Sequence, residues 1–287
     1  MFRPACFLLC CAAAWAQPDI SVLLEEKTLA ALHRFDAGFD GSLGVAAIDL
    51  ATGRRFSLHG DTVFTQASVI KVPVLVRLFQ AAGEGKLRLD GKVTLEPREA
   101  VGGSGHLQFA LKDGPVTLTI RDLIDKMIAD SDNTATNKCI DLAGMDSVNR
   151  LLDQLGLPKT RLLRKMMDSA AAGRNDENIS TPNEMATLME MIYRGRFGAE
   201  PAGFLRKVHG DMQAGLPLDV EVASKTGELP GVRAQSGIIY LPHRPFVLSI
   251  MSGFIDDRAS PVAEATRIVY RMFEKLERSN RYGHTVR

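Results

Sequence analysis

The sequence predicts an α+β fold, within the broader α/β class, in which both ends of the chain build one antiparallel sheet and a helical lobe is inserted between its strands. Two observations predict this. Strand-like segments lie near both ends of the 287 residues, and the middle is dominated by apolar residues at helical spacing. We therefore expect a sheet lobe at residues 17–64 and 211–287, flanked by helices, and an all-helical lobe at residues 65–210.

The first elements are predicted from hydrophobic periodicity and turn residues. A helix is expected over residues 20–37, followed by strands over residues 42–50 and 55–58, with the turn A-T-G at residues 51–53 between the two strands.

The inserted segment turns helical from residue 68. Thr119, with Asp122 three residues later, is a good helix N-cap, and Pro182 suits the first turn of its helix. The predicted helices cover residues 68–83, 120–129, 134–142, 146–155 and 182–194. Strand character returns at residues 220–225, 235–241 and 246–254, and residues 261–277 form a closing amphipathic helix.

Residues 1–16 are predicted to be a secretory signal peptide. Arg3 provides a positive start, an apolar stretch follows, and A-W-A at residues 14–16 has the small-x-small pattern of a cleavage site. The stretch is too short to span a bilayer. We expect a secreted or periplasmic protein that is not held at a membrane after cleavage. A lipoprotein site at Cys10 or Cys11 is the weaker alternative, because a leucine precedes Cys10.

Composition excludes several classes of partner. The formal net charge is +1, so there is no basic field for nucleic acid or anionic lipid. Only Cys139 remains after the predicted cleavage, which leaves no intramolecular disulfide, and its apolar helical surroundings predict a buried hydrophobe rather than a nucleophile. None of the six histidines has a zinc-ligand spacing, so we expect no metal or other cofactor.

The first motif that could take part in catalysis is S-V-I-K at residues 68–71. Ser68 and Lys71 are three residues apart and would share one face of a helix. A lysine can remove the proton of a serine hydroxyl when burial or a nearby cation lowers its pKa. An isolated serine–lysine pair of this spacing usually lies on the solvated surface of a protein. Here the apolar residues on both sides of the pair predict a buried helix. Pro73 would crowd the carbonyl group of Val69, so we expect local distortion beside Ser68.

The second motif is S-D-N at residues 131–133, between two helical stretches. Helix capping is the structural alternative, because these residue types are preferred N-caps. Asp132 could cap the helix while Ser131 and Asn133 face a cleft.

The third motif is K-T-G at residues 225–227, which is expected to end a strand. A strand that runs into a glycine turn is the structural alternative. In a functional site, Lys225 and Thr226 could bind a substrate carboxylate, and Gly227 would let the substrate approach the backbone.

In this order the three motifs resemble those of the penicillin-recognising serine enzymes, and most closely the class A β-lactamases. The resemblance covers essentially the whole mature chain and includes the S-T-P entry to a helix at residues 180–182. It implies a β-lactamase/transpeptidase-like fold and a small-molecule substrate, either a β-lactam or an acyl-D-Ala-D-Ala-like peptide. We expect the protein to be a monomer.

The resemblance also implies catalytic roles. Ser68 would attack the lactam or amide carbonyl, Lys71 would take part in its deprotonation, and Ser131 would pass a proton to the leaving nitrogen. The backbone N–H groups of Ser68 and Glu228 would form the oxyanion hole.

Further residues would bind the substrate. Asn133 would hold its side-chain amide and contact Lys71, and Lys225, with Thr226, would bind its carboxylate. His106 lies where the family places an aromatic ring at the cleft mouth, and an ordinary surface histidine is the alternative. Arg233 is a candidate for carboxylate recognition, with an ordinary surface arginine as the alternative.

One segment departs from the family pattern. Class A enzymes carry a glutamate in a loop before the S-T-P entry, where it activates the water that hydrolyses the acyl-enzyme. Alignment of Arg161 and Arg164 places Met166 at that position, and methionine cannot accept a proton. Asp168 is the candidate replacement base. The family's ion pair across this loop would join Arg164 to the neutral Asn178, so we expect that pair to be lost and the loop to fold differently.

This departure shapes the functional hypothesis. If Asp168, Asp176 and Glu177 all fail to reach the water, the acyl-enzyme persists, because loss of a positioned base costs about 10²–10⁴-fold. We expect a serine hydrolase that is acylated at Ser68 and hydrolyses β-lactams, with slow deacylation. The alternatives are a D-alanyl-D-alanine peptidase or esterase and a β-lactam-acylated sensor. The loop's apolar side chains are expected to pack beneath it: Leu163, Met166 and Met167.

Overall fold

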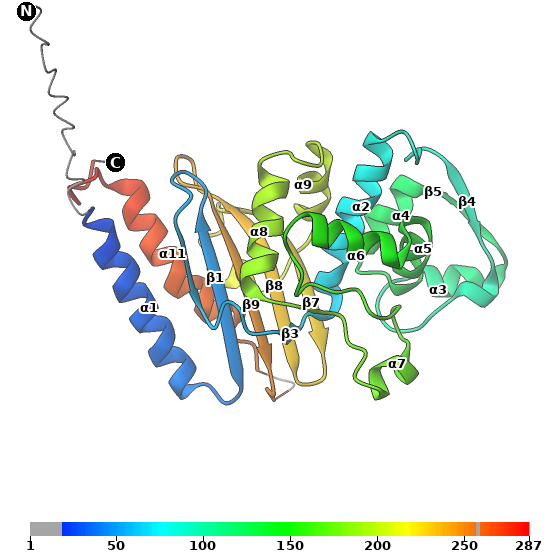
Figure 1. Ribbon diagram of the computed structural model, residues 1–287, viewed down its shortest axis with the longest axis horizontal. Helices are drawn as coiled ribbons and strands as arrows, with labels where there is room; N and C mark the ends of the chain where they lie inside the picture. The colour runs from blue at the N-terminus through cyan, green and yellow to red at the C-terminus, as the bar shows by residue number, and fades with distance from the viewer. Residues whose placement is uncertain (1–18, 257–258, 287) are drawn as a thin grey trace, which may run out of the picture.

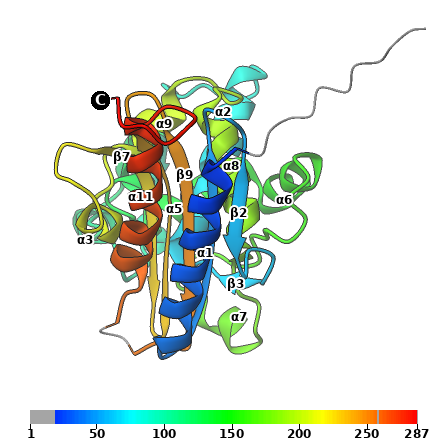
Figure 2. The same cartoon turned by 90° about the vertical axis from the view of Figure 1, so that its left-hand side faces the viewer.

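The computed structural model describes residues 19–256 and 259–286 and has three layers (Figures 1 and 2). A five-stranded sheet forms the middle layer. Two terminal helices cover one of its faces, and the inserted helical segment covers the other. The predicted signal peptide lies outside the described residues. Among the described helices, none has the length and apolar character needed to cross a membrane.

The sheet joins the two ends of the chain, as the sequence predicts. Its strand order is β2-β1-β9-β8-β7, and every neighbouring pair is antiparallel. The strands are β1 (Ser42–Asp49), β2 (Arg55–Leu58), β7 (Glu221–Leu229), β8 (Val232–Tyr240) and β9 (Phe246–Gly253). The edge strand β7 borders the inserted lobe, which places the third motif at the boundary between the two parts of the fold.

The outer layer consists of α1 (Ser21–Gly38) and α11 (Val262–Arg278), packed side by side on the sheet (Figure 2). Their apolar stripes bury a core with the strands, in which Leu32 and Phe273 are 0% exposed. The rings of Phe246 and Phe273 stack with their centroids 4.0 Å apart. An aromatic pair of this kind adds stability beyond its buried area.

The inner layer and the inserted lobe are mainly helical. α8 lies against β1, β8 and β9, and α2 passes through the centre of the lobe. The longer helices are α2 (Lys71–Gly83), α4 (Ile120–Ile128), α5 (Asn133–Ala143), α6 (Met145–Gln154), α8 (Pro182–Tyr193) and α9 (Glu200–Leu205). The short ones are α3 (Leu107–Ala110), α7 (Ser169–Gly173) and α10 (Asp211–Ala214), with 3₁₀ turns at Ala67–Ile70, Pro97–Glu99 and Leu111–Asp113.

Two small ribbons were not predicted. The lobe holds an antiparallel pair of β4 (Lys92–Leu95) and β5 (Val116–Thr119), so it is not composed of helices alone. A second pair, β3 (Phe64–Thr65) and β6 (Ile179–Ser180), ties the chain just before Ser68 to the end of the loop that contains Met166. Strands of two to four residues carry too little alternation to be recognised from sequence.

The predicted Thr119 cap and the predicted place of Pro182 in the first turn of its helix are confirmed. The Thr119 hydroxyl accepts the Asp122 backbone N–H at the start of α4. At the start of α8, the Thr181 hydroxyl accepts the Glu184 backbone N–H, and Pro182 lies in the first turn. Cys139 is completely buried, as expected of a small core residue.

Two predicted boundaries were wrong near the motifs. Residues Ala67–Ile70 form a 3₁₀ turn, and the α-helix begins only at Lys71. Strand β7 does not end at Lys225 but continues through Gly227 to Leu229. The strand can continue because glycine leaves room for the backbone of the 3₁₀ turn, which packs against it.

Candidate active site

Ser68 lies in the 3₁₀ turn that leads into α2. The preceding residue, Ala67, has φ +47°, a left-handed conformation that is strained for any residue except glycine. The expected distortion beside Ser68 is therefore present. The turn packs against β7, where an added β-carbon on Gly227 would lie 3.1 Å from the Ser68 backbone nitrogen. The backbones of the serine and of the K-T-G strand are thus brought together.

Lys71 lies one helical turn beyond Ser68 and is 0% exposed. Its Nζ donates to the Ser131 carbonyl oxygen at 2.7 Å, to the Ser131 Oγ at 2.9 Å and to the Asn133 Oδ1 at 3.1 Å. These three acceptors come from the second motif, so the structure joins the first two motifs into one polar cluster. A buried amine needs such partners.

Ser131 connects the second motif to the third. Its Oγ also accepts from Lys225 Nζ at 3.2 Å, so one hydroxyl lies between two lysines. The residue has φ +52°, and such strain is typical of functional positions. Asp132 caps α5 by accepting the Ala135 backbone N–H at 2.8 Å, and it also accepts that of Leu107. Capping and cluster formation are therefore both fulfilled by this motif.

Burial changes the acid–base behaviour of both lysines. Desolvation, reinforced by the nearby Lys225 ammonium, holds the pKa of Lys71 well below its usual range. Desolvation also lowers the pKa of Lys225, to about 8. Lys71 is thereby biased toward the neutral amine, which can accept a proton, and Lys225 remains the better cation at neutral pH.

The outer face of β7 carries the remaining polar groups of the third motif. Thr226 is partly exposed, and the Glu228 side chain is 71% exposed. Arg233, the cross-strand partner of Glu228 on β8, forms an ion pair with it at 2.8 Å. Arg233 is therefore held at the site, but its guanidinium already has a carboxylate partner.

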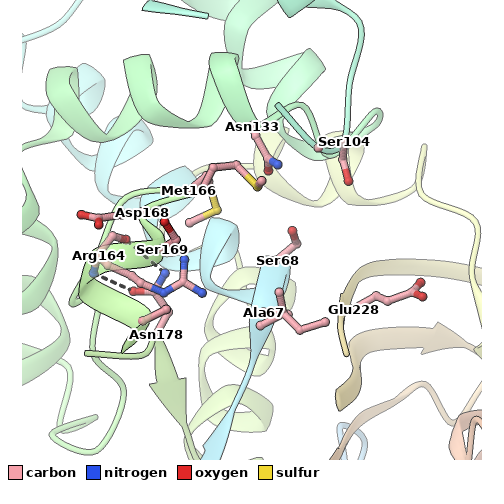
Figure 3. Close-up of a pocket in the computed structure, with 14 residues that line it drawn as sticks. Ala67, Ser68, Ser104, Asn133, Arg164, Met166, Asp168, Ser169, Asn178 and Glu228 are labelled. Carbon is pink, nitrogen blue, oxygen red and sulfur yellow. Dashed lines mark hydrogen bonds between the residues drawn. The ribbon is translucent and has the colours of Figure 1, made fainter. Parts of the chain in front are cut away.

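A cavity of about 330 Å³ opens directly beside Ser68 (Figure 3). In this view the loop with Met166 and Arg164 forms one side, Asn133 and Ser104 lie above, and Glu228 lies on the opposite side of Ser68 from Met166. Its wall comprises Ala67, Ser68, Gly103, Ser104, Asn133, Arg164, Met166, Met167, Asp168, Ser169, Ala172, Asn178, Glu228 and Leu229.

Met166 stands at the cavity wall with 7% of its side chain exposed. Asn137 holds its backbone from both sides, accepting the Met166 N–H at 2.8 Å and donating to its carbonyl at 3.1 Å. Asn137 was not predicted as a site residue, although its position four residues after Asn133, on the same face of the helix, was a usable signal. The predicted packing of the loop was only partly right, because Met167 is 56% and Leu163 43% exposed.

The expected loss of the loop ion pair was wrong. Arg164 bonds through Nε and Nη2 to one carboxylate oxygen of Glu177, at 3.1 and 2.8 Å. Asn178 complements this clamp by accepting the backbone N–H groups of Leu163 and Arg164 and donating to the Arg164 carbonyl. The acidic partner of Arg164 is thus Glu177, one residue before the position that the family pattern indicates. The neutral Asn178 closes the loop through hydrogen bonds to its backbone.

Asp168 lines the same cavity but is engaged elsewhere. One of its carboxylate oxygens accepts the Ala171 backbone N–H at 2.9 Å and caps α7. Figure 3 shows the carboxylate on the far side of Met166, directed away from Ser68.

His106 does not belong to the cavity wall, which Ser104 lines instead. The histidine is exposed at the start of α3, with its ring centroid 6.4 Å from that of Phe109. In the described part of the chain, no three His, Cys, Asp or Glu side chains group as a metal ion would require.

The assembled groups suit acyl transfer through a serine. Ser68, with a partly exposed hydroxyl, and Asn133 line the cavity. The neutral-biased Lys71 amine bonds to Asn133 and, through the Ser131 hydroxyl, is linked to the Lys225 cation. Comparison with known proteins agrees: the model of the beta-lactamase enzyme family matches residues 25–273. The chain belongs to the beta-lactamase enzyme family. It is a serine β-lactamase-like hydrolase.

The individual proteins that match this chain are distant in sequence, and the solved structures among them are close to it in fold. Beta-lactamase SME-1 of Serratia marcescens is 26% identical over 285 residues, which cover 93% of this chain and 96% of that protein. An ancestral class A β-lactamase matches with a TM-score of 0.76 at 28% identity, covering 86% and 99% of the two chains. PBP-A matches with a TM-score of 0.78 and 26% identity, and the match covers 87% of this chain and 96% of that chain.

Proposed function

We propose that this β-lactamase family member forms an acyl-enzyme through Ser68, opens β-lactam rings and releases the product slowly. The observation that carries the acylation half is the buried Lys71 amine, bonded to Ser131 and Asn133 beside the serine. The observation that carries the slow half is Met166 at the cavity wall.

In acylation, the Lys71 amine accepts the Ser68 proton as Oγ attacks the carbonyl carbon. The Ser131 hydroxyl, which contacts both lysines, gives its proton to the leaving nitrogen as the C–N bond breaks and regains one from the Lys71 ammonium, so that Lys71 ends as the neutral amine. The backbone N–H groups of Ser68 and Glu228 stabilise the oxyanion, a contribution of a few kcal/mol per donor.

Substrate binding is assigned to the same cavity. Asn133, which lines it, holds the acyl side-chain amide, while Lys225 and Thr226 attract an anionic group near the leaving nitrogen. Gly227 keeps the strand close enough to Ser68 for both functions.

Deacylation requires a base that activates water. Met166 cannot supply it, and Asp168 is engaged as the cap of α7. A structural neighbour supports acyl-enzyme formation in this fold: a form of PBP-A in which a leucine is replaced by glutamate is described as an acyl-enzyme complex with penicillin G, and it is 27% identical with a TM-score of 0.78.

The missing base favours one further candidate function. A D-alanyl-D-alanine peptidase or esterase would use every group assigned above and turn over a peptide or ester instead of a lactam. A sensor that is acylated by a β-lactam and stops there is the limiting case of the same chemistry.

One experiment tests the proposed function. The protein is mixed with a chromogenic cephalosporin, ring opening is followed over time, and the intact protein is weighed. A stoichiometric burst followed by slow turnover, with a mass adduct on Ser68, is the expected result. Fast sustained turnover would contradict slow deacylation. The absence of both burst and adduct, or an undiminished adduct in Ser68→Ala, would overturn the proposed function.

We further propose that the protein is exported and acts as a monomer. The signal-like sequence of residues 1–16 supports export. Cell fractionation with an antibody against the protein, and light scattering of the purified chain, test the two parts separately.

A further inference from the structure

The Glu228 carboxylate has no part in the acyl-transfer steps proposed above, although its backbone N–H does. In the strand β7 it follows Thr226 by two residues, so both side chains project from the same face, about 7 Å apart along the strand. Thr226 and Lys225 are the groups assigned to an anion on the leaving-nitrogen side. A carboxylate therefore stands next to the place where a substrate carboxylate would bind.

The Glu228 carboxylate is open to solvent and occupies the guanidinium of Arg233. Its side chain is 71% exposed and lines the cavity, whereas its partner Arg233 is only 15% exposed. An incoming anion must displace Glu228 to reach that guanidinium. The other cation, Lys225, is buried and already donates to the Ser131 hydroxyl and to the Thr226 carbonyl oxygen.

We propose that Glu228 is a specificity-determining residue whose carboxylate outweighs the attraction of Lys225 and Thr226 for an anion: it disfavours a free carboxylate on the leaving-group side of the scissile bond and favours a neutral or cationic group there. This inference rests on the proposed function of the Ser68 site. Two like charges about 7 Å apart at a protein surface change binding by roughly tenfold.

The test uses one chromogenic cephalosporin in three forms: the free ring carboxylate, its methyl ester and its choline ester. The lactam and the chromophore are the same in all three; the methyl ester removes the negative charge near Lys225, and the choline ester adds a positive charge. Acylation rates are measured for the wild type, for Glu228→Gln, which keeps the backbone N–H, and for Glu221→Gln. Glu221 is a matched control because it lies in the same strand and is also paired with an arginine, Arg206.

The wild type is expected to be acylated faster by the choline ester than by the carboxylate. Glu228→Gln should shift the carboxylate-to-choline rate ratio toward the carboxylate by roughly tenfold, while Glu221→Gln leaves it unchanged. A shift below twofold in Glu228→Gln, an equal shift in Glu221→Gln, or a wild type that prefers the carboxylate overturns the inference. In these cases Ser68 is still acylated, so the proposed function stands; if no form acylates the wild type, both fail.

Discussion

Gly227 and Gln66 lie so close that a β-carbon on Gly227 would stand 2.4 Å from the Gln66 carbonyl oxygen. This approach presses the K-T-G strand against the 3₁₀ turn that carries Ser68, and it allows backbone groups of both segments to face one cavity.

Gly227→Ala is therefore expected to reduce acylation by about 10²–10³-fold, because the β-carbon would push the strand away from the turn and displace an oxyanion donor. Overpacking should also cost about 1–3 kcal/mol of unfolding free energy. Burst kinetics and thermal unfolding measure the two effects. Gly83→Ala is the control, since its β-carbon meets nothing within 4 Å; equal acylation in the two variants would contradict the prediction.

Met166→Glu should accelerate deacylation by about 10²–10⁴-fold, the range of a positioned general base. The backbone of residue 166 is held by Asn137, so the new carboxylate would start from a defined place on the cavity wall. Decay of the mass adduct after the burst gives the rate. Leu163→Glu places the same charge on the same loop, at an exposed side chain outside the cavity wall, and should leave the rate unchanged.

Asp168→Asn is expected to leave deacylation unchanged. Asparagine caps helices about as well as aspartate, so α7 should stay intact while the carboxylate is removed. The same adduct assay decides the matter. If the adduct of this variant decays at least about tenfold more slowly than that of the wild type, Asp168 is the base after all.

Glu177→Gln should lower the unfolding free energy by about 1–2 kcal/mol, because the Arg164 side chain is only 10% exposed and would lose its charged partner. Denaturant unfolding measures this change, and limited proteolysis reports opening of the loop. In the control Asp176→Asn, the lost partner is Arg174, which is 66% exposed, and the effect should stay below about 0.5 kcal/mol. Similar losses in both variants would argue against a clamp.

The rate of acylation by an anionic cephalosporin should depend on pH in two directions. Lys225 is cationic below its pKa of about 8, so binding weakens as the pH rises through that value. Lys71 must be neutral to accept a proton, so the rate also falls when acid protonates it. In Lys225→Arg, whose guanidinium stays charged, the alkaline decline should disappear. An unchanged alkaline limb would assign it to another group.

Features that depend on neighbouring residues were predictable from the sequence. The Asp132 and Thr181 caps act within one helical turn, and the strands at both chain ends follow from their own alternation. The chemistry of the three motifs was likewise predictable, because the residue types and their order in the chain are enough to indicate which groups could act in catalysis. The boundaries at Lys71 and Leu229 were missed, since each depends on the contact between the 3₁₀ turn and β7.

By itself, the sequence determined which groups are available: the serine, the two lysines, the second hydroxyl and a methionine in place of a base. Only the tertiary structure decided how they are used. It placed Ser131 between Lys71 and Lys225, gave Arg164 a new partner in Glu177, and set Glu228 beside the anion site. The physical reason is that pKa shifts, ion pairs and cavity walls depend on distances between segments far apart in the chain, which no local pattern encodes.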